Sequence, residues 1–281
     1  MNSPIFEKNA QFWSTKKIVH DLKNFISIYE NRPIKNNKGG MLFSHMFYFY
    51  NILNNLKPDL VVESGIYKGQ STWLIETVLP NSKIVSIDIN LKQREYISEK
   101  AFYSSDDFKF QDFKDIPENS LVFFDDHVNH VDRINDANFF GFKNIILEDN
   151  YIGSKSDFQT IKQIYNNYFF NHNPGFLSLI KTFFLFSEIS LKKIVSKKYN
   201  AKKDLDIISK RIRDGYSKNT TFENIDKLIE TYFEFPPLYQ YNHDFDKTLI
   251  KEPIFEKIPD NIIKYIHQSN DFNFFTFIKL K

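Results

Sequence analysis

The sequence predicts an α/β protein built on a doubly wound, mostly parallel sheet. Two observations support this prediction. Between Pro58 and Asp149, short apolar runs alternate with segments whose apolar residues recur at helical spacing. These runs also end in acidic residues or in a glycine-containing turn, at the edge of a parallel sheet where ligands bind. Helical patterns before and after this region add a cap and an insertion to the sheet.

Two helical patterns precede the first predicted strand. Ile5 to Tyr29 and Met41 to Leu56 both place apolar residues at helical spacing. The segment between them, Asn31 to Gly40, is rich in Asn, Lys, Pro and Gly and is expected to be a loop. Residues 1–57 therefore form a predicted N-terminal helical cap.

Five apolar runs follow as the predicted strands of the core. They are Leu60–Val62, Lys83–Ile87, Asp106–Phe110, Leu121–Phe124 and Asn144–Leu147. Helices are expected in the gaps, at Ser71–Leu79, Leu91–Phe102 and His130–Phe140. Strands alternating with helices over residues 58–150 predict a parallel α/β core that binds a ligand.

The pattern after the core is mainly helical. Helices are expected at Asp157–Phe170, Phe176–Lys198, Asp204–Tyr232 and Asp260–His267, and a last strand at Phe272–Leu280. Residues 151–235 are thus a predicted helical insertion or lid, and residues 236–281 complete the sheet. The helical regions offer a surface for homo-oligomers. The lysine-rich stretch Lys181–Lys203 is a solvated helix face, or a contact with a membrane surface or an anionic substrate.

Composition narrows the class of protein. The 281 residues carry a formal charge of only +2, so we expect no nucleic-acid partner. The chain contains no cysteine, which excludes thiolate nucleophiles and cysteine-ligated metals. Met1 to Lys17 does not resemble a secretory signal, and no apolar run is long enough to span a bilayer. A cytoplasmic protein without a transmembrane segment is the expectation.

The turn after the first strand is the predicted cofactor site. It contains Glu63, Gly65 and Gly69, with Ser71 at the start of the next helix. The glycines allow a tight turn and a close approach of the backbone to a ligand, and the helix N-terminus offers free amide groups. No Lys-Ser/Thr pair follows Gly69, and the spacing differs from Gly-x-Gly-x-x-Gly. A nucleoside-triphosphate loop and a dinucleotide loop are therefore both excluded.

This spacing resembles motif I of class I S-adenosylmethionine-dependent methyltransferases. The resemblance implies that the turn wraps the methionine part of S-adenosylmethionine. It also implies that Asp88, at the end of the second strand, takes the ribose hydroxyls. Asp112 is the candidate for the adenine, and Ser71 would cap the helix and bind the methionine carboxylate. The implied fold is a Rossmann-like methyltransferase sheet.

Acids and histidines follow the fourth and fifth strands. They are Asp125, Asp126, His127, His130, Glu148 and Asp149. Because neighbouring parallel strands end at the same edge, these groups are expected to converge beside the cofactor turn. Gathered carboxylates repel one another unless a proton or cation intervenes, and oxygen ligands suit Mg²⁺.

Two segments, Phe123 to His127 and Ile145 to Asn150, resemble divalent-metal-dependent O-methyltransferases of the macrocin and cephalosporin-biosynthesis type and related sugar O-methyltransferases. In that group an Asp after strand four and an acidic pair after strand five bind Mg²⁺, and a nearby His is the base. Only Asp126 separates Asp125 from His127, where the group has two residues between Asp and His. Either aspartate is therefore a candidate ligand, and either His127 or His130 a candidate base.

The predicted activity is Mg²⁺-assisted O-methylation of a hydroxyl on a small molecule or sugar. Mg²⁺ would lower the pKa of the hydroxyl, and a neutral histidine would accept its proton. Two alternatives stay open. One is a non-catalytic cofactor-binding or interaction protein with a degenerate site, and the other is a methyltransferase that acts on a macromolecule.

Overall fold

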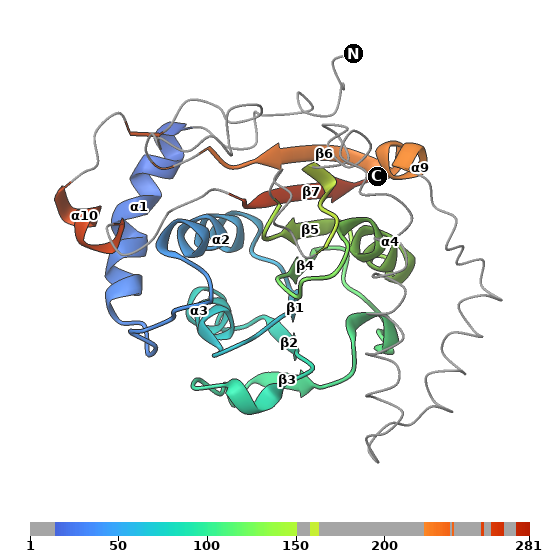
Figure 1. The fold of residues 1–281 in the computed structure, drawn as a ribbon, viewed down its shortest axis with the longest axis horizontal. Helices are drawn as coiled ribbons and strands as arrows, with labels where there is room; N and C mark the ends of the chain where they lie inside the picture. The colour runs from blue at the N-terminus through green and yellow to red at the C-terminus, as the bar shows by residue number, and fades with distance from the viewer. Residues whose placement is uncertain are drawn as a thin grey trace, which may run out of the picture.

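In the computed structural model of the chain, seven strands form one sheet in the order β3-β2-β1-β4-β5-β7-β6 (Figure 1). The structure describes residues 15–150, 158–162, 222–236, 238, 254–255, 260–266 and 274–281. The strands are β1 (Leu60–Ser64), β2 (Lys83–Ile87), β3 (Ala101–Ser104), β4 (Ser120–Phe124), β5 (Asn144–Leu147), β6 (Ile229–Glu234) and β7 (Thr276–Leu280). Strands β1 to β5 pair in parallel, whereas β7 runs antiparallel to both β5 and β6. The predicted doubly wound, mostly parallel sheet is confirmed.

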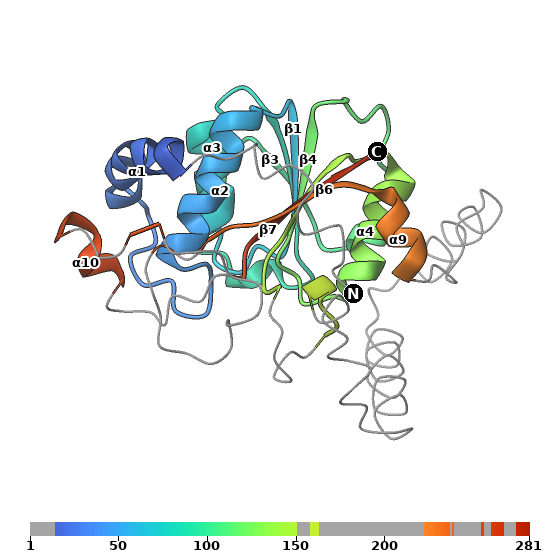
Figure 2. The same cartoon turned by 90° about the horizontal axis from the view of Figure 1, so that it is seen from above.

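Helices cover both faces of this sheet (Figure 2). One face carries α1 (Thr15–Glu30), α2 (Phe43–Leu56) and α3 (Gln70–Val78), and the other carries α4 (His130–Phe140) and α9 (Phe222–Leu228). Helix α10 (Asp260–Ile266) lies near α1 (Figure 1). Two short 3₁₀ turns, η3 (Leu91–Gln93) and η4 (Phe108–Phe110), lie in the connections on either side of β3.

Side-chain alternation explains why the sheet has two apolar faces. In β4, Leu121 and Phe123 belong to the core under α1, α2 and α3, whereas Val122 and Phe124 belong to the core on the opposite face. Every residue of β4 is buried. A strand buried on both faces forms a continuous apolar run instead of an alternating one, which is why this strand was easy to predict.

The third strand was predicted in the wrong place. The sequence indicated Asp106–Phe110, but β3 is Ala101–Ser104 and the apolar residues of the predicted run form η4. Phe108 is buried below the sheet, whereas Phe102 of the true strand is 66% exposed. The buried aromatic rings of a turn therefore gave a pattern like that of a buried strand. The true edge strand is open to solvent on one side and has no such pattern.

Two helix predictions were also wrong. Within Leu91–Phe102 only η3 is helical, and the segment ends in the first residues of β3. Within Asp204–Tyr232, residues 222–228 are helical but β6 begins at Ile229 and pairs with β7. The rest of that segment, the predicted helix Phe176–Lys198 and the lysine-rich stretch lie outside the described residues, as does most of Asp157–Phe170. The division of the chain at residues 57, 150 and 235 stays a prediction.

The sheet positions a ligand site at the carboxyl ends of β1 and β4. The strand order reverses between these two neighbours, since β2 and β3 continue on one side and β5 on the other. Ligands of open α/β sheets bind at this switch point. In the part of the chain that the structure describes, no helix is both long and apolar enough to cross a bilayer.

Candidate active site

The turn after β1 depends on glycine at two positions. Gly65 and Gly69 have φ angles of 95° and 92°, in the left-handed region that favours glycine. A Cβ atom on Gly65 would lie 1.9 Å from the carbonyl oxygen of Asp125, and one on Gly69 would lie 2.5 Å from that of Tyr96. The turn therefore packs against the loop after β4 at Gly65 and against the segment between η3 and β3 at Gly69, with no room for a side chain at either position.

Asp88, at the end of β2, holds this turn. Its Oδ2 accepts hydrogen bonds from the backbone N–H groups of Ile66 at 2.8 Å and Tyr67 at 3.0 Å. Its Oδ1 accepts from the N–H of Asn90 at 2.7 Å. A carboxylate has about four lone-pair directions, so one remains on Oδ1 for a ribose hydroxyl. The structure thus brings Asp88 to the glycine turn.

Glu63 lies beneath the turn and is fully buried. The hydroxyls of Thr72 and Ser86 each donate to its Oε1 at 2.5 Å. Burial raises the pKa of Glu63, and hydrogen bonds from Ser71, Ser86 and Thr72 oppose that shift. This carboxyl group therefore ties β1 to β2 and α3 from below.

Ser71 does not cap the helix as predicted. The N-cap of α3 is Gly69, without a side-chain cap, and the buried Ser71 contacts Glu63 instead. Its hydroxyl is turned inward because a serine in the first helical turn follows the buried face of α3. The free amide groups of that turn remain available for a ligand.

In the described chain, no contact joins Asp112 to the cofactor turn. Its side chain is 61% exposed and pairs with Lys114 at 3.2 Å. The misplaced third strand explains this position, because Asp112 follows η4 and not a strand. The residues that directly follow β3 are Ser105 and Asp106.

Three carboxyl groups converge after β4 and β5. Glu148 is buried, Asp125 is half-buried, and the side chain of Asp149 is 26% exposed. Burial, together with the charges of Glu148 and Asp149, raises the pKa of Asp125 well above its ordinary value. The pKa of Glu148 is raised by burial and by Asp149 in the same way. We call Asp125, Glu148 and Asp149 the acidic cluster.

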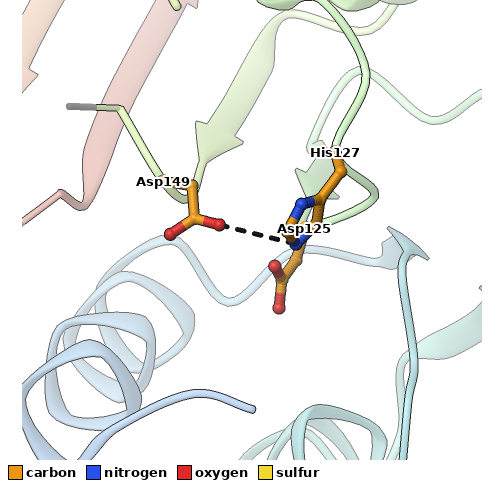
Figure 3. A group of neighbouring side chains, drawn as sticks. All are labelled: Asp125, His127 and Asp149. Carbon is orange, nitrogen blue, oxygen red and sulfur yellow. Dashed lines mark ion pairs between the residues drawn. The ribbon is translucent and has the colours of Figure 1, made fainter. Parts of the chain in front are cut away.

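His127 lies at the rim of the acidic cluster (Figure 3). Its Nε2 is 3.6 Å from Oδ2 of Asp149, and its side chain is 54% exposed. One ligand atom from each of Asp125, His127 and Asp149 can be chosen so that all lie within 4.8 Å of one another. His127 and Asp149 both have positive φ angles, 54° and 55°, a strained backbone that often marks a functional site.

Asp126 points away from the acidic cluster. Its Oδ2 lies 2.8 Å from Nη2 of Arg133 and accepts a hydrogen bond from the Ser64 hydroxyl at 2.5 Å. Arg133, on α4, is 2% exposed and also pairs with Asp107 through two 3.0 Å contacts and with Asp136 at 3.3 Å. We call Arg133, Asp107, Asp126 and Asp136 the arginine cluster. The structure therefore separates the two consecutive aspartates.

His130 is buried at the start of α4. Its Nδ1 accepts a hydrogen bond from the backbone N–H of Ile161 at 3.3 Å. Burial lowers the pKa of His130 to about 3, against weaker contributions from Glu148 and Asn150. The imidazole ring of His130 is therefore neutral, has no access to solvent and supports the segment after β5 through its bond to Ile161.

The sequence did not single out Arg133. Only five of the 37 basic residues are arginine. An arginine inside an apolar helix face is typical of multiple pairing with carboxylates. The low number of arginines was the one feature of the sequence that could have drawn attention to Arg133. His45 lies within the predicted cap helix Met41 to Leu56, but its contact with Glu148 at 2.6 Å was not predictable from sequence.

Part of the sequence matches a known protein family. Residues 38–113, which include the glycine turn and Asp88, match the family described as rhamnosyl O-methyltransferase/CmcI. No curated protein matches the chain in sequence.

Solved structures give partial likenesses. CmcI with SAH is 18% identical over 42% of this chain and 68% of its own, with a TM-score of 0.36. Two further CmcI chains are covered over 59% and 58% of their length. SAH-bound PaMTH1 from Podospora anserina is 13% identical over 48% of this chain and 62% of its own, with a TM-score of 0.35. A putative O-methyltransferase from Klebsiella pneumoniae is 8% identical over 95% and 89%, with a TM-score of 0.40.

The sheet is Rossmann-like, with mostly parallel strands and helices on both faces. Over residues 38–113 the chain is similar to the rhamnosyl O-methyltransferase/CmcI family, so the predicted resemblance to methyltransferases is confirmed for that part of the chain.

Proposed function

We propose that the protein transfers the methyl group of S-adenosylmethionine to a hydroxyl oxygen of a small molecule or sugar, and that the acidic cluster holds Mg²⁺ for this reaction. The proposal of a metal rests on one observation. Three carboxyl groups converge at the switch point, two of them with raised pKa values. In the described part of the chain, no Lys or Arg pairs with any of the three.

The residues present fit a hard divalent cation. Mg²⁺ prefers oxygen ligands, binds through a few carboxylates and keeps several waters that a substrate can displace. Asp125, Glu148 and Asp149 supply only oxygen atoms, at an edge open to the pocket that His127 also lines. Asp126 is not among the proposed ligands because the arginine cluster already holds it.

The cofactor is proposed to lie over the glycine turn. The backbone passes close to the ligand at Gly65 and Gly69, and the start of α3 directs free amide groups toward the methionine carboxylate. Asp88 faces the ribose hydroxyls and accepts a hydrogen bond from one of them with the lone pair that its three backbone contacts leave on Oδ1. Glu63 and Ser71 support the turn from below and do not contact the ligand in this proposal.

His127 is the proposed general base. It is exposed at the pocket, whereas His130 is covered and its Nδ1 already accepts a hydrogen bond. The acceptor hydroxyl gives its proton to His127 while its oxygen forms the new C–O bond. The S–C bond breaks at the same time, and its electron pair stays on sulfur. A bound cation would lower the pKa of the hydroxyl and so assist the proton transfer.

Isothermal titration with S-adenosylmethionine and S-adenosylhomocysteine tests the cofactor half of this proposal. The wild-type protein is expected to bind both, and Asp88→Ala to weaken both. Glu148→Ala is expected to leave cofactor affinity nearly unchanged. Absence of cofactor binding by the intact protein would overturn the proposal.

Methyl transfer to a panel of hydroxylated small molecules and glycosides tests the catalytic half. Turnover is expected to stop in EDTA, to return with Mg²⁺ and to be absent in Glu148→Ala. Turnover that EDTA does not change would remove the metal. Cofactor binding without turnover on any acceptor would favour the non-catalytic alternative.

A further inference from the structure

A side chain of the helical cap reaches the acidic cluster. His45, the third residue of α2, is 3% exposed, and its Nδ1 lies 2.6 Å from Oε1 of Glu148. The two residues are 103 positions apart in the sequence. Helix α2 is therefore more than a cover for the sheet, because it contacts one of the proposed cation ligands directly.

Both partners of this contact are fixed in position. Residues 43 to 53 of α2 are all buried, so the helix cannot turn or slide without opening the core. The ring of Phe275 lies 5.9 Å from the ring of His45. On the other side, the backbone N–H of Glu148 donates to the carbonyl of Phe124 at 3.0 Å. The distance between imidazole and carboxylate is thus set by the packed fold.

The contact acts on one of the two oxygens of Glu148. When Glu148 is ionised, the tautomer of His45 with a proton on Nδ1 donates to Oε1, and the same carboxyl group also contacts Asp125. When a donor holds one side of a carboxylate, the remaining lone pairs of that carboxylate stay directed at the ion that it shares with the other ligands. Partners of this kind orient metal ligands, and their removal typically weakens metal affinity about 10- to 100-fold.

We propose that His45 is a positioning residue for the cation site, holding Oε1 of Glu148 so that this carboxylate faces the ion together with Asp125. The inference rests on the proposed metal site and adds to it a residue from the N-terminal cap. His45 donates through Nδ1 and makes no contact with the ion itself.

Two substitutions separate this role from a general loss of packing. The amide nitrogen of asparagine takes the place of histidine Nδ1, whereas that of glutamine takes the place of Nε2. His45→Asn should therefore keep the bond to Glu148, and His45→Gln and His45→Ala should lose it. Asn51→Ala is the matched control, because Asn51 is buried in the same helix and its amide bonds only to the carbonyl of Phe47.

The experiment measures Mn²⁺ binding to the cofactor-free protein by electron paramagnetic resonance, with thermal melting alongside. Mn²⁺ affinity is expected to fall about 10- to 100-fold in His45→Gln and His45→Ala and to stay within about threefold of wild type in His45→Asn. Asn51→Ala should lower the melting temperature and leave Mn²⁺ affinity unchanged.

The possible failures are distinguishable. If the wild type binds Mn²⁺ and His45→Ala binds it equally well, the positioning role is wrong and the metal site stands. Equal losses in His45→Asn and His45→Gln would also overturn it, because the loss would not follow the Nδ1 donor. If the wild-type protein binds no Mn²⁺, the metal site and the role of His45 fall together.

Discussion

Two groups of three carboxyl groups lie on opposite sides of the loop after β4, and they differ in how their charge is balanced. The arginine cluster surrounds a buried guanidinium, which forms ion pairs with Asp107, Asp126 and Asp136. In the described chain, the acidic cluster forms ion pairs only with His45 and His127. The pKa shifts follow this difference.

In the arginine cluster, Asp107 ionises readily. Burial opposes ionisation of Asp107, but the Arg133 guanidinium outweighs it and holds the pKa of that carboxyl well below its ordinary value. In the acidic cluster, burial and mutual repulsion raise the pKa values of Asp125 and Glu148. The comparison teaches that the chain supplies its own cation to one group, whereas the other is the group for which we propose a cation from solution.

Removing the guanidinium should have the largest effect. Arg133→Met leaves three carboxyl groups buried without their partner, and breaking a buried ion pair from one side costs about 3–5 kcal/mol of unfolding free energy. Urea unfolding would measure the loss. Lys114→Met, at a side chain that is 76% exposed, is the control and should stay within about 0.5 kcal/mol of wild type. A small loss in Arg133→Met would mean that the arginine cluster is not what holds the loop after β4.

A smaller effect, dependent on pH, is expected from Asp107→Asn. At pH 7 the loss of a charged hydrogen-bonded pair should cost about 1.5–3 kcal/mol. Because the pKa of Asp107 is lowered in the folded protein, its contribution is fully present above its ordinary value of about 3.9 and is lost as the pH falls through the folded pKa. The gap between variant and wild type should therefore narrow below about pH 4. Glu118→Gln, at an exposed acid, should show no such gap, and a gap that persists at low pH would contradict the pairing.

The acidic cluster should respond in the opposite direction. Asp125→Asn removes a carboxyl group whose charged form is disfavoured, so the metal-free protein should gain about 1 kcal/mol of stability at neutral pH. Thermal melting in EDTA measures this gain. Millimolar Mg²⁺ should raise the melting temperature of the wild type and not that of the variant. A variant less stable than wild type in EDTA would show that these carboxyl groups do not repel one another.

The parts of the fold and of the site differ in how well they could be predicted from the sequence. Strands β1, β2, β4 and β5 were predictable because each is a run of apolar residues followed by a glycine turn or acids. The converging acids after β4 and β5 follow from parallel pairing, which brings neighbouring strand ends to one edge. Edge strand β3 was not predictable, because exposed Phe102 carries no pattern of burial.

The choice between Asp125 and Asp126 depends on contacts that are distant in sequence. Consecutive side chains in an extended segment point to opposite sides, so one aspartate of the pair must face each way. Which one faces the acidic cluster is decided by Ser64 and Arg133, which hold Asp126, and the Ser64 contact spans 62 positions. No local spacing contains that information.

Asp112 belongs to neither cluster and therefore serves as a reference for both. Its ion pair with Lys114 lies at the surface, where such pairs contribute between zero and about 1 kcal/mol. Asp112→Ala should therefore change stability by less than about 0.5 kcal/mol and leave S-adenosylmethionine affinity at the wild-type value. Isothermal titration of Asp88→Ala in parallel provides the reference for the proposed cofactor contact. A clear loss of affinity in Asp112→Ala would instead show that the segment after η4 moves onto the adenine when the cofactor binds, and would restore the role that the sequence predicted for this residue.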